Sequence, residues 1–158
     1  GGLIGVIIAQ IATCKKFKVK FLVLTDILSL TVPLGFMLGR IANFINGELY
    51  GRITQHPIGI IFPNGGNFPR HPSQLYEAFF EGFILFLILN LLFYFSKIKS
   101  LTGMLTGVFI LLYGVFRFLI EFLREPDSHL GLFLNYFSMG QILCIPILFA
   151  GILILFRR

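Results

Sequence analysis

The sequence GRIANFINGELYGR, at residues 39–52, closes a long apolar run. Its fourteen residues include two arginines, two asparagines, one glutamate and three glycines. Polar groups at membrane depth are costly and usually mark a site. An arginine can bind phosphate with a planar fork, an asparagine amide can both donate and accept, and glycine lets backbones approach closely. The stretch therefore indicates a polar site at the end of a membrane helix. The alternative is an ordinary helix end, with small residues that serve packing and an arginine at the membrane interface.

The composition indicates an integral membrane protein. Of 158 residues, 56% are hydrophobic and only 13% are charged, whereas a soluble domain carries about 25% charged residues. The mean hydropathy is +0.89. The two cysteines, Cys14 and Cys144, lie in apolar runs and are interpreted as small buried hydrophobic residues. The chain starts inside an apolar segment without an initiator Met, so we expect its natural N-terminus to lie upstream.

Five apolar segments predict an all-α fold, a polytopic membrane helix bundle. They cover residues 3–14 and about 21–45, 73–95, 103–123 and 136–156. The last four reach the roughly 20 residues that a spanning helix needs, and the first is expected to be a truncated span. The connection at 46–72 is rich in Gly, Pro and Asn and predicts an irregular loop. We expect a single, N-terminally truncated membrane domain over residues 1–158.

The basic residues predict the orientation in the membrane. Lysines at 15–20 and 97–99 and the two arginines at 157–158 fall on one side, which the positive-inside rule makes cytoplasmic. The loops at 46–72 and 124–135 then lie outside. The basic residues at or near the outer side are all arginines, namely Arg40, Arg52, Arg70, Arg117 and Arg124. Recognition of an anionic headgroup or phosphate explains them, and snorkelling of the loop arginines to the interface is the alternative.

Two further stretches place charges within apolar helices. Glu77 and Glu81 are spaced i, i+4 on one face, so at least one of them needs a cationic partner or a proton. Arg117, Glu121 and Arg124 share another helical face at i, i+4 and i+7. Arg117 lies about two turns inside the helix end and needs a partner. A self-neutralising Arg117–Glu121 pair that serves packing alone is the alternative.

Four motifs resemble those of the prolipoprotein diacylglyceryl transferase family, bacterial membrane enzymes that lipidate lipoprotein precursors. The family signature G-R-x-[GA]-N-F-x-N-x-E-x-x-G is met at residues 39–51. The runs H-P-S-Q-L-Y-E, Y-G-x-F-R-x-x-x-E-x-x-R-x-P-D and S-M-G-Q follow at residues 71–77, 113–127 and 138–141. The family's H-G-G-L-I-G run would place a histidine just before Gly1, so an inactive fragment of the enzyme is one alternative.

The resemblance implies transfer of the diacylglyceryl group of phosphatidylglycerol to the thiol of a lipobox cysteine, with glycerol phosphate as the leaving group. The expected partners are phosphatidylglycerol, the prolipoprotein signal peptide and the bilayer, without nucleic acid, metal or cofactor. The expected location is the bacterial inner membrane, multi-pass, with the active side at the outer leaflet and a cytoplasmic C-terminus. An anion transporter and a structural subunit are the rival hypotheses, since intramembrane arginines suit a conduction path or mutual pairing as well.

The implied roles fall on seven residues. Arg40 would bind the lipid phosphate, Asn43 would orient the headgroup, and Arg117 would stabilise the departing phosphate. Glu48 and Glu121 would hold the arginines, and Gly51 would allow close backbone approach. His71 is a possible proton carrier or headgroup contact. The catalytic set is thus Arg40, Arg117, Glu121 and His71, and the substrate-binding set is Arg40, Asn43, Glu48, Gly51 and Arg117.

Overall fold

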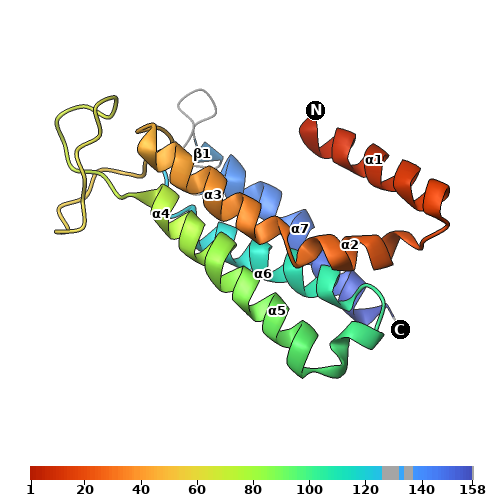
Figure 1. Cartoon of the computed structure of the whole chain (residues 1–158). Coiled ribbons are helices and arrows are strands. Elements are labelled where there is room, and N and C mark those ends of the chain that lie inside the picture. Colours follow the sequence, from red (N-terminus) through yellow and green to blue (C-terminus); the bar gives the residue numbers. More distant parts are fainter. Residues whose placement is uncertain (126–131, 134–136, 158) are drawn as a thin grey trace.

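A computed structural model describes residues 1–125, 132–133 and 137–157, and within these ranges the chain is mostly helical (Figure 1). Pro126 and Asp127 of the third motif, and Arg158, lie outside the described residues. The helices are α1 Gly2–Phe17, α2 Phe21–Ser29, α3 Val32–Ile45, α4 Ser73–Glu77, the π-helix η1 Ala78–Ile84, α5 Leu85–Phe95, the 3-10 helix η2 Lys97–Ser100, α6 Met104–Ile120 and α7 Met139–Phe156. The two-residue strands β1 Leu132–Phe133 and β2 Phe137–Ser138 pair antiparallel.

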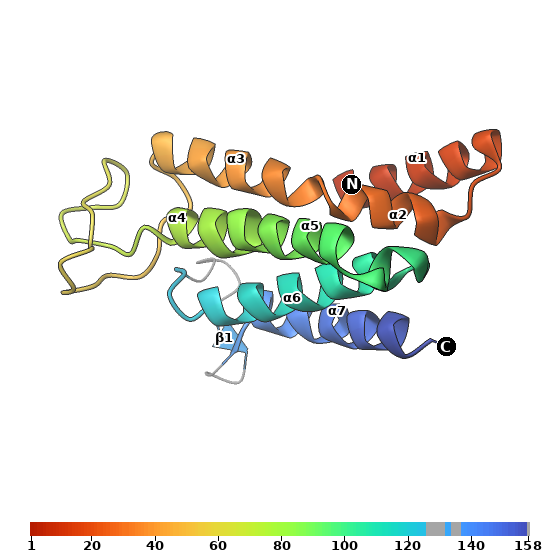
Figure 2. The same cartoon turned by 60° about the horizontal axis from the view of Figure 1, so that its bottom comes forward.

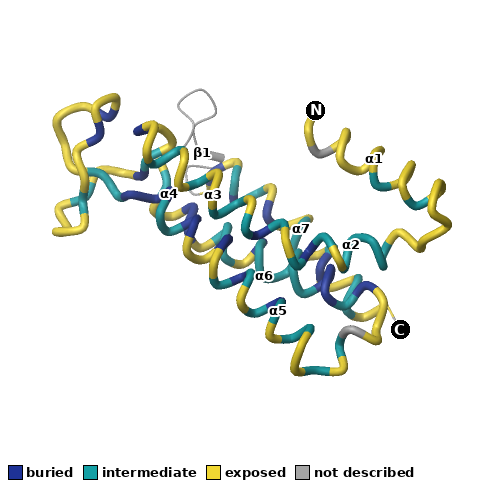
Figure 3. Tube along the Cα trace, in the orientation of Figure 1, coloured by how far each residue is buried: buried dark blue, intermediate teal, exposed yellow. Residues whose placement is uncertain are grey.

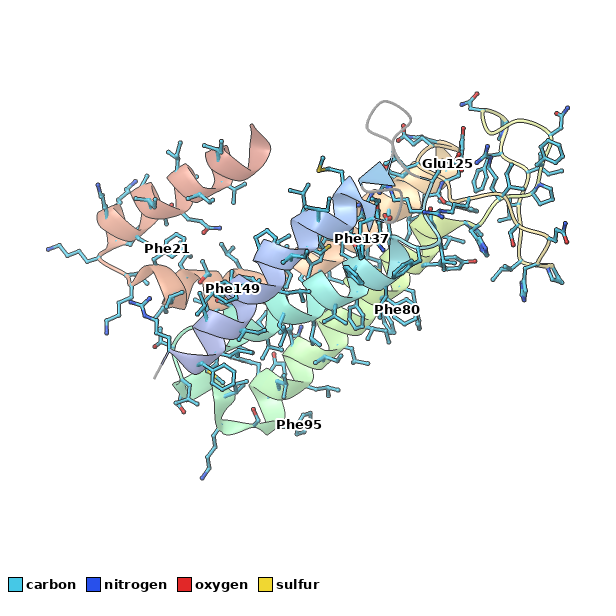
Figure 4. All side chains as sticks on the ribbon, turned by 180° about the vertical axis from the view of Figure 1, so that it is seen from behind. Phe21, Phe80, Phe95, Glu125, Phe137 and Phe149 are labelled. Carbon is cyan, nitrogen blue, oxygen red and sulfur yellow. The ribbon has the colours of Figure 1, made fainter. Side chains whose placement is uncertain are left out.

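The helices α3 to α7 form an elongated bundle, with α6 and α7 packed along each other (Figures 1 and 2). Helix α1 lies apart from this bundle and connects to it through α2 (Figure 1). Residues 46–72 contain no helix and form a lobe of turns beyond the ends of α3 and α4. Glu125 lies at the lobe end of the bundle and Phe95 at the opposite end (Figure 4). The bundle therefore has one end rich in turns and one end formed by tight helix connections.

Two of the described helices are long and apolar enough to cross a membrane. They are the continuous helix Ser73–Phe95, of 23 residues, and Met139–Phe156, of 18 residues. The bent pair of α2 and α3 makes a third if it counts as one span, and α6 is a shorter apolar helix of 17 residues. The expectation of a mostly helical chain with membrane-spanning segments is confirmed at this level, whereas the number of five segments stays a prediction.

The predicted single span at 21–45 is broken into two helices whose axes differ by 46°. Pro33 lies in the first turn of α3 and lacks the backbone N–H that would continue the helix. The hydroxyl of Thr31 donates to Leu28 O at the break. Asn90 of α5 donates to Leu30 O (3.2 Å), so a carbonyl freed by the break is satisfied from the neighbouring span.

The buried residues concentrate where the bundle helices meet, and exposed residues dominate α1 and the lobe (Figure 3). Leu85, Leu89 and Leu105 form the buried apolar core. Large apolar side chains such as Leu87 and Leu91 remain exposed on the outer face of α5. An apolar outer face is typical of helices that lie in hydrocarbon, where no polar cover is required.

Asp26 of α2 caps the N-terminus of α6. Its carboxylate accepts from the backbone N–H groups of Gly103 (2.6 Å) and Thr106 (2.8 Å) and from the Thr106 hydroxyl (2.7 Å). The first backbone N–H groups of a helix have no partner within it and carry partial positive charge, so a carboxylate here is favourable. This contact joins two helices that are distant in the sequence.

Replacing Asp26 by Ala is expected to lower the free energy of unfolding by about 1–2 kcal/mol, because the cap of α6 is lost. Asp26→Asn keeps an acceptor oxygen and is expected to cost less. Thermal unfolding in detergent, followed by circular dichroism, measures both variants. Equal melting temperatures for the wild type and Asp26→Ala would contradict the cap.

Candidate functional site

The carboxylate of Glu77 contacts three arginines from two other segments of the chain. Arg40 Nε of α3 lies 2.6 Å from Glu77 Oε2, and Arg117 Nη1 of α6 lies 2.8 Å from Oε1. Arg124 Nη1, just beyond α6, lies 3.3 Å from the same Oε1. The Glu77 side chain is fully buried, at 0% exposure. The expectation that the Glu77–Glu81 pair needs a cationic partner is therefore confirmed, whereas the central place of Glu77 was not foreseen.

Arg117 also contacts two further carboxylates. Its Nη2 lies 3.0 Å from Glu121 Oε2, one turn along the chain, and its Nη1 lies 3.8 Å from Glu81 Oε1. The intrahelical Arg117–Glu121 pair therefore exists, but as part of a larger set. We call this set the arginine–glutamate cluster, and its members are Arg40, Arg117, Arg124, Glu77, Glu81 and Glu121.

The cluster is balanced in formal charge but unequal in exposure. Its glutamate side chains are at most 6% exposed, whereas those of Arg40, Arg117 and Arg124 are 22%, 15% and 13% exposed. Buried charges are tolerated when they have a partner of opposite charge, and each of these carboxylates lies within 4 Å of a guanidinium nitrogen. The carboxylates are thus enclosed, and the arginine side chains are the more accessible part of the cluster. An anion that approaches the cluster would therefore meet arginine before glutamate.

The start of α7 holds Glu121 in place. The Ser138 hydroxyl donates to Glu121 Oε1 (2.9 Å) and accepts from the backbone N–H of Gln141. The Gln141 side chain in turn accepts from Ser138 N, which completes a capping box, so the predicted N-cap at Ser138 is confirmed. A methyl group on Gly140 would lie 2.5 Å from Glu121 Oε1. The S-M-G-Q motif therefore leaves room for this carboxylate and binds it.

Asn43 and Glu48 lie beside each other near the end of α3. In the amide orientation that gives its NH2 group acceptors, Asn43 donates to Gly39 O within α3 and to Glu48 Oε1, each at 3.2 Å. Glu48 is exposed, and its carboxylate also accepts from Asn46 Nδ2 (3.4 Å). The expectation that Glu48 orients an arginine is not met by the contacts of the described residues. Its position in the turn beyond α3 directs the carboxylate to asparagine amides instead.

Gly51 lies where the lobe meets the end of α6. A methyl group on it would lie 2.4 Å from Leu123 O and 2.8 Å from His71 O, and its N–H donates to His71 O (2.8 Å). The expected close backbone approach at Gly51 is therefore present, and the approaching groups belong to the protein itself. Its role in holding a substrate stays a prediction.

The HPSQ run ties the lobe to α4. The Ser73 hydroxyl donates to Leu49 O (3.1 Å), and the Gln74 amide donates to Glu48 O. Pro72 precedes the helix at the N-cap position, and Ser73 is not its cap because its hydroxyl is used across the chain. Leu49 has a positive φ of 56°, a conformation that non-glycine residues adopt rarely and that these bonds help to hold. Neither role could be predicted from spacing alone.

His71 lies outside the arginine–glutamate cluster. Its Nδ1 lies 3.2 Å from the Tyr76 hydroxyl, and Tyr76 directly precedes Glu77. Burial, and secondarily the nearby His56, lowers the pKa of His71 below its ordinary value of 6.5. The imidazole is therefore mostly neutral at pH 7 and can accept a proton.

The remaining loop arginines have partners within the chain. Arg70 pairs with Glu125, and its guanidinium carbon lies 4.9 Å from the centre of the Tyr50 ring. Arg52 Nε donates to the backbone oxygen of Arg124 (2.9 Å). These contacts link the lobe to the end of α6, so snorkelling does not account for them alone.

The sequence model of one family, described as prolipoprotein diacylglyceryl transferase, matches residues 1–157. The chain belongs to this family. Three relatives named phosphatidylglycerol–prolipoprotein diacylglyceryl transferase illustrate the similarity. Those of Rickettsia felis and Rickettsia canadensis are 54% and 56% identical over 151 residues, which is 96% of this chain and 58% of each relative. That of Ehrlichia ruminantium, strain Welgevonden, is 53% identical over 157 residues, or 98% of this chain and 61% of the relative.

The chain therefore spans about three fifths of the length of these curated diacylglyceryl transferases. The family signature falls on residues 39–51, and Arg40 at its second position is one of the three arginines that contact Glu77. Two other motifs of the family supply Arg117 and the α7 start that holds Glu121. Motifs that are far apart in the sequence thus meet in one cluster, with Arg40 and Arg117 at Glu77 and the start of α7 at Glu121.

Replacing Glu77 by Gln is expected to lower the free energy of unfolding by about 3–5 kcal/mol, since three partly buried arginines lose the fully buried carboxylate that they share. Glu125→Gln is the matched control, because Glu125 is 45% exposed and its pair with Arg70 should contribute less than about 1 kcal/mol. Denaturant titration in detergent compares the two variants. Equal losses would contradict a central role for Glu77.

Proposed function

We propose that this protein transfers the diacylglyceryl group of phosphatidylglycerol to the thiol of the lipobox cysteine in a prolipoprotein. The family membership and the names of the relatives support the reaction. The observation that carries it is the arginine–glutamate cluster, in which three partly exposed arginine side chains contact one fully buried carboxylate. Such a surface suits an anionic phosphodiester.

The chemistry requires positive charge at the phosphate. The thiolate sulfur forms a bond to the carbon of the diacylglyceryl group that carries the phosphate oxygen. The bond between that carbon and the oxygen breaks, and glycerol phosphate leaves with the electron pair. The thiol proton is taken up by a base or by the leaving phosphate. Charge on the phosphate oxygens grows as the bond breaks, so a preset cationic donor lowers the barrier, typically by about 3–4 kcal/mol.

The proposed roles follow from position. Arg40 has the most exposed arginine side chain of the cluster and would bind the lipid phosphate, with Asn43 one turn further along α3 orienting the headgroup. Arg117 would stabilise the departing phosphate, while Glu77 and Glu121 keep both arginines charged and in place. His71, neutral and hydrogen-bonded to Tyr76, would carry the proton or contact the headgroup.

An apolar groove of about 380 Å³ supports a lipid substrate. All of its lining residues except Leu119 directly precede a cluster residue in the sequence. These residues are Tyr76, Phe80, Phe116, Ile120 and Leu123. An acyl chain in this groove would place its headgroup within reach of the arginines, and the apolar walls would exclude water from the reacting atoms.

The chain would form one membrane domain of five segments in the bacterial inner membrane. The cluster and the lobe lie at one end of the bundle, and the connections that carry Lys18, Lys20 and Lys97 lie at the other (Figures 1 and 2). The positive-inside rule makes the lysine end cytoplasmic, so the cluster would face the outer leaflet and the C-terminus the cytoplasm. We expect no cofactor.

Arg40→Lys is expected to lower diacylglyceryl transfer by about 100-fold, nearly as much as Arg40→Ala, because lysine cannot make the bidentate phosphate contact. The measurement is transfer from labelled phosphatidylglycerol to a lipobox-cysteine peptide in membranes. Arg157→Lys, at the far end of the bundle, is the control and should leave the rate unchanged. Full activity in Arg40→Lys would rule out the phosphate-clamp role.

A second experiment compares diacylglyceryl transfer by residues 1–158 with transfer by a longer chain that carries the family's histidine ahead of Gly1. The comparison tests whether residues 1–158 are an active enzyme or an inactive fragment of one. Transfer by the longer chain alone would establish the family reaction and make residues 1–158 an inactive part of it. Transfer by both chains would make that histidine dispensable and direct attention to His71 as the base. The absence of product from both, with folded and abundant protein, would favour an anion transporter or a structural subunit.

A further inference from the structure

Gly82 lies where the π-helix η1 crosses α3. A methyl group built on Gly82 would lie 2.5 Å from Met37 Cβ, 2.8 Å from Met37 Cα and 3.0 Å from Met37 N. Non-bonded carbon atoms prefer a separation of about 3.5–4.0 Å, so any side chain at this position would force the helices apart. Gly82 is buried, and its lack of a side chain lets the two backbones touch.

The same two helices form the Arg40–Glu77 ion pair. Met37 and Arg40 are three residues apart on α3 and share a face. Glu77 and Gly82 are five residues apart, and the i→i+5 hydrogen bonding of a π-turn brings such residues over one another. The helices therefore meet twice along one line, with Gly82 against Met37 and Glu77 Oε2 2.6 Å from Arg40 Nε.

The position of α3 is not set by a rigid continuation of the chain. On one side α3 is separated from α2 by the 46° break, and on the other it ends in the turn at Gly47, whose φ is +65°. Lateral contacts must therefore hold the helix that carries Arg40. The crossing of Gly82 and Met37 lies about one helical turn from Arg40, close to the ion pair with Glu77.

We propose that Gly82 is a positioning residue for Arg40. Its contact with Met37 sets the separation of η1 and α3 at which Arg40 pairs with Glu77 and presents its exposed edge to an anion. The consequence for catalysis rests on the proposed function, since Arg40 is the proposed phosphate ligand. Gly82 itself touches no reacting atom.

Gly82→Ala is the test, measured as transfer per folded molecule in the chain that supports the reaction. A displacement of about 1 Å at a positioned group can reduce a rate by about 100-fold, and a loss of that order is expected here. The loss should appear in kcat more than in the amount of folded protein.

Gly151→Ala is the matched control for a general packing defect. A methyl group on Gly151 would lie 2.9 Å from Leu111 N and 3.1 Å from Leu111 Cα, at the crossing of α6 and α7. This variant should lower the melting temperature while leaving transfer per folded molecule unchanged. Gly35→Ala, on α3 with no atom within 4 Å of the added methyl, controls for the substitution itself.

A second measurement does not depend on catalysis. In protein labelled with 15N-arginine, the Nε–H signal of Arg40, assigned through Arg40→Lys, reports the bond to Glu77. We expect the signal to shift and to exchange faster with water in Gly82→Ala, and to stay unchanged in Gly151→Ala. An unchanged Arg40 signal in Gly82→Ala would overturn the proposal. A shifted signal in a protein that shows no transfer in any form would support the positioning contact and reject the proposed function instead.

Discussion

A carboxylate that is fully buried among apolar helices must be neutralised, and the neutralisation of Glu77 organises this protein. Three guanidinium groups from α3, the last turn of α6 and the residues beyond it converge on its two oxygens. Each arginine is itself costly to bury, so the ion pairs constrain where α3, α4 and α6 can lie relative to one another. The ion pairs thus fix how these helices are aligned with one another, and apolar side chains fill the space around the pairs.

The structures around the cluster keep its glutamates inward and its arginines outward. The capping box of α7 binds Glu121 and adds the positive end of a helix dipole to its surroundings. The HPSQ run holds the unusual turn at Leu49 and joins the lobe to α4. The same side chains that stabilise the fold therefore decide which part of the cluster an anion can reach, and stability and anion binding are expected to change together in many variants.

Much of the candidate site could be predicted from residue types and spacing. The apolar runs indicated helices, the i, i+4 and i+7 charges indicated one polar face on the segment of Arg117, and the pair Glu77 and Glu81 indicated a missing cation. Two features of the geometry were not foreseen. The break between α2 and α3 divided a segment that hydropathy reads as continuous, and Glu48 turned toward asparagine amides because it follows the end of α3.

The sequence by itself determined the family, the helical and apolar character of the chain, and the set of polar residues that must find partners, because each of these depends on local composition or on motif order. Only the tertiary structure decided which partners they find. Arg40 and Glu77 are 37 positions apart, and Glu77 and Arg117 are 40 apart, so no periodicity links them. Their meeting depends on helix crossings such as Gly82 on Met37, where the distance between two backbones, rather than any property of one segment, places the charges together.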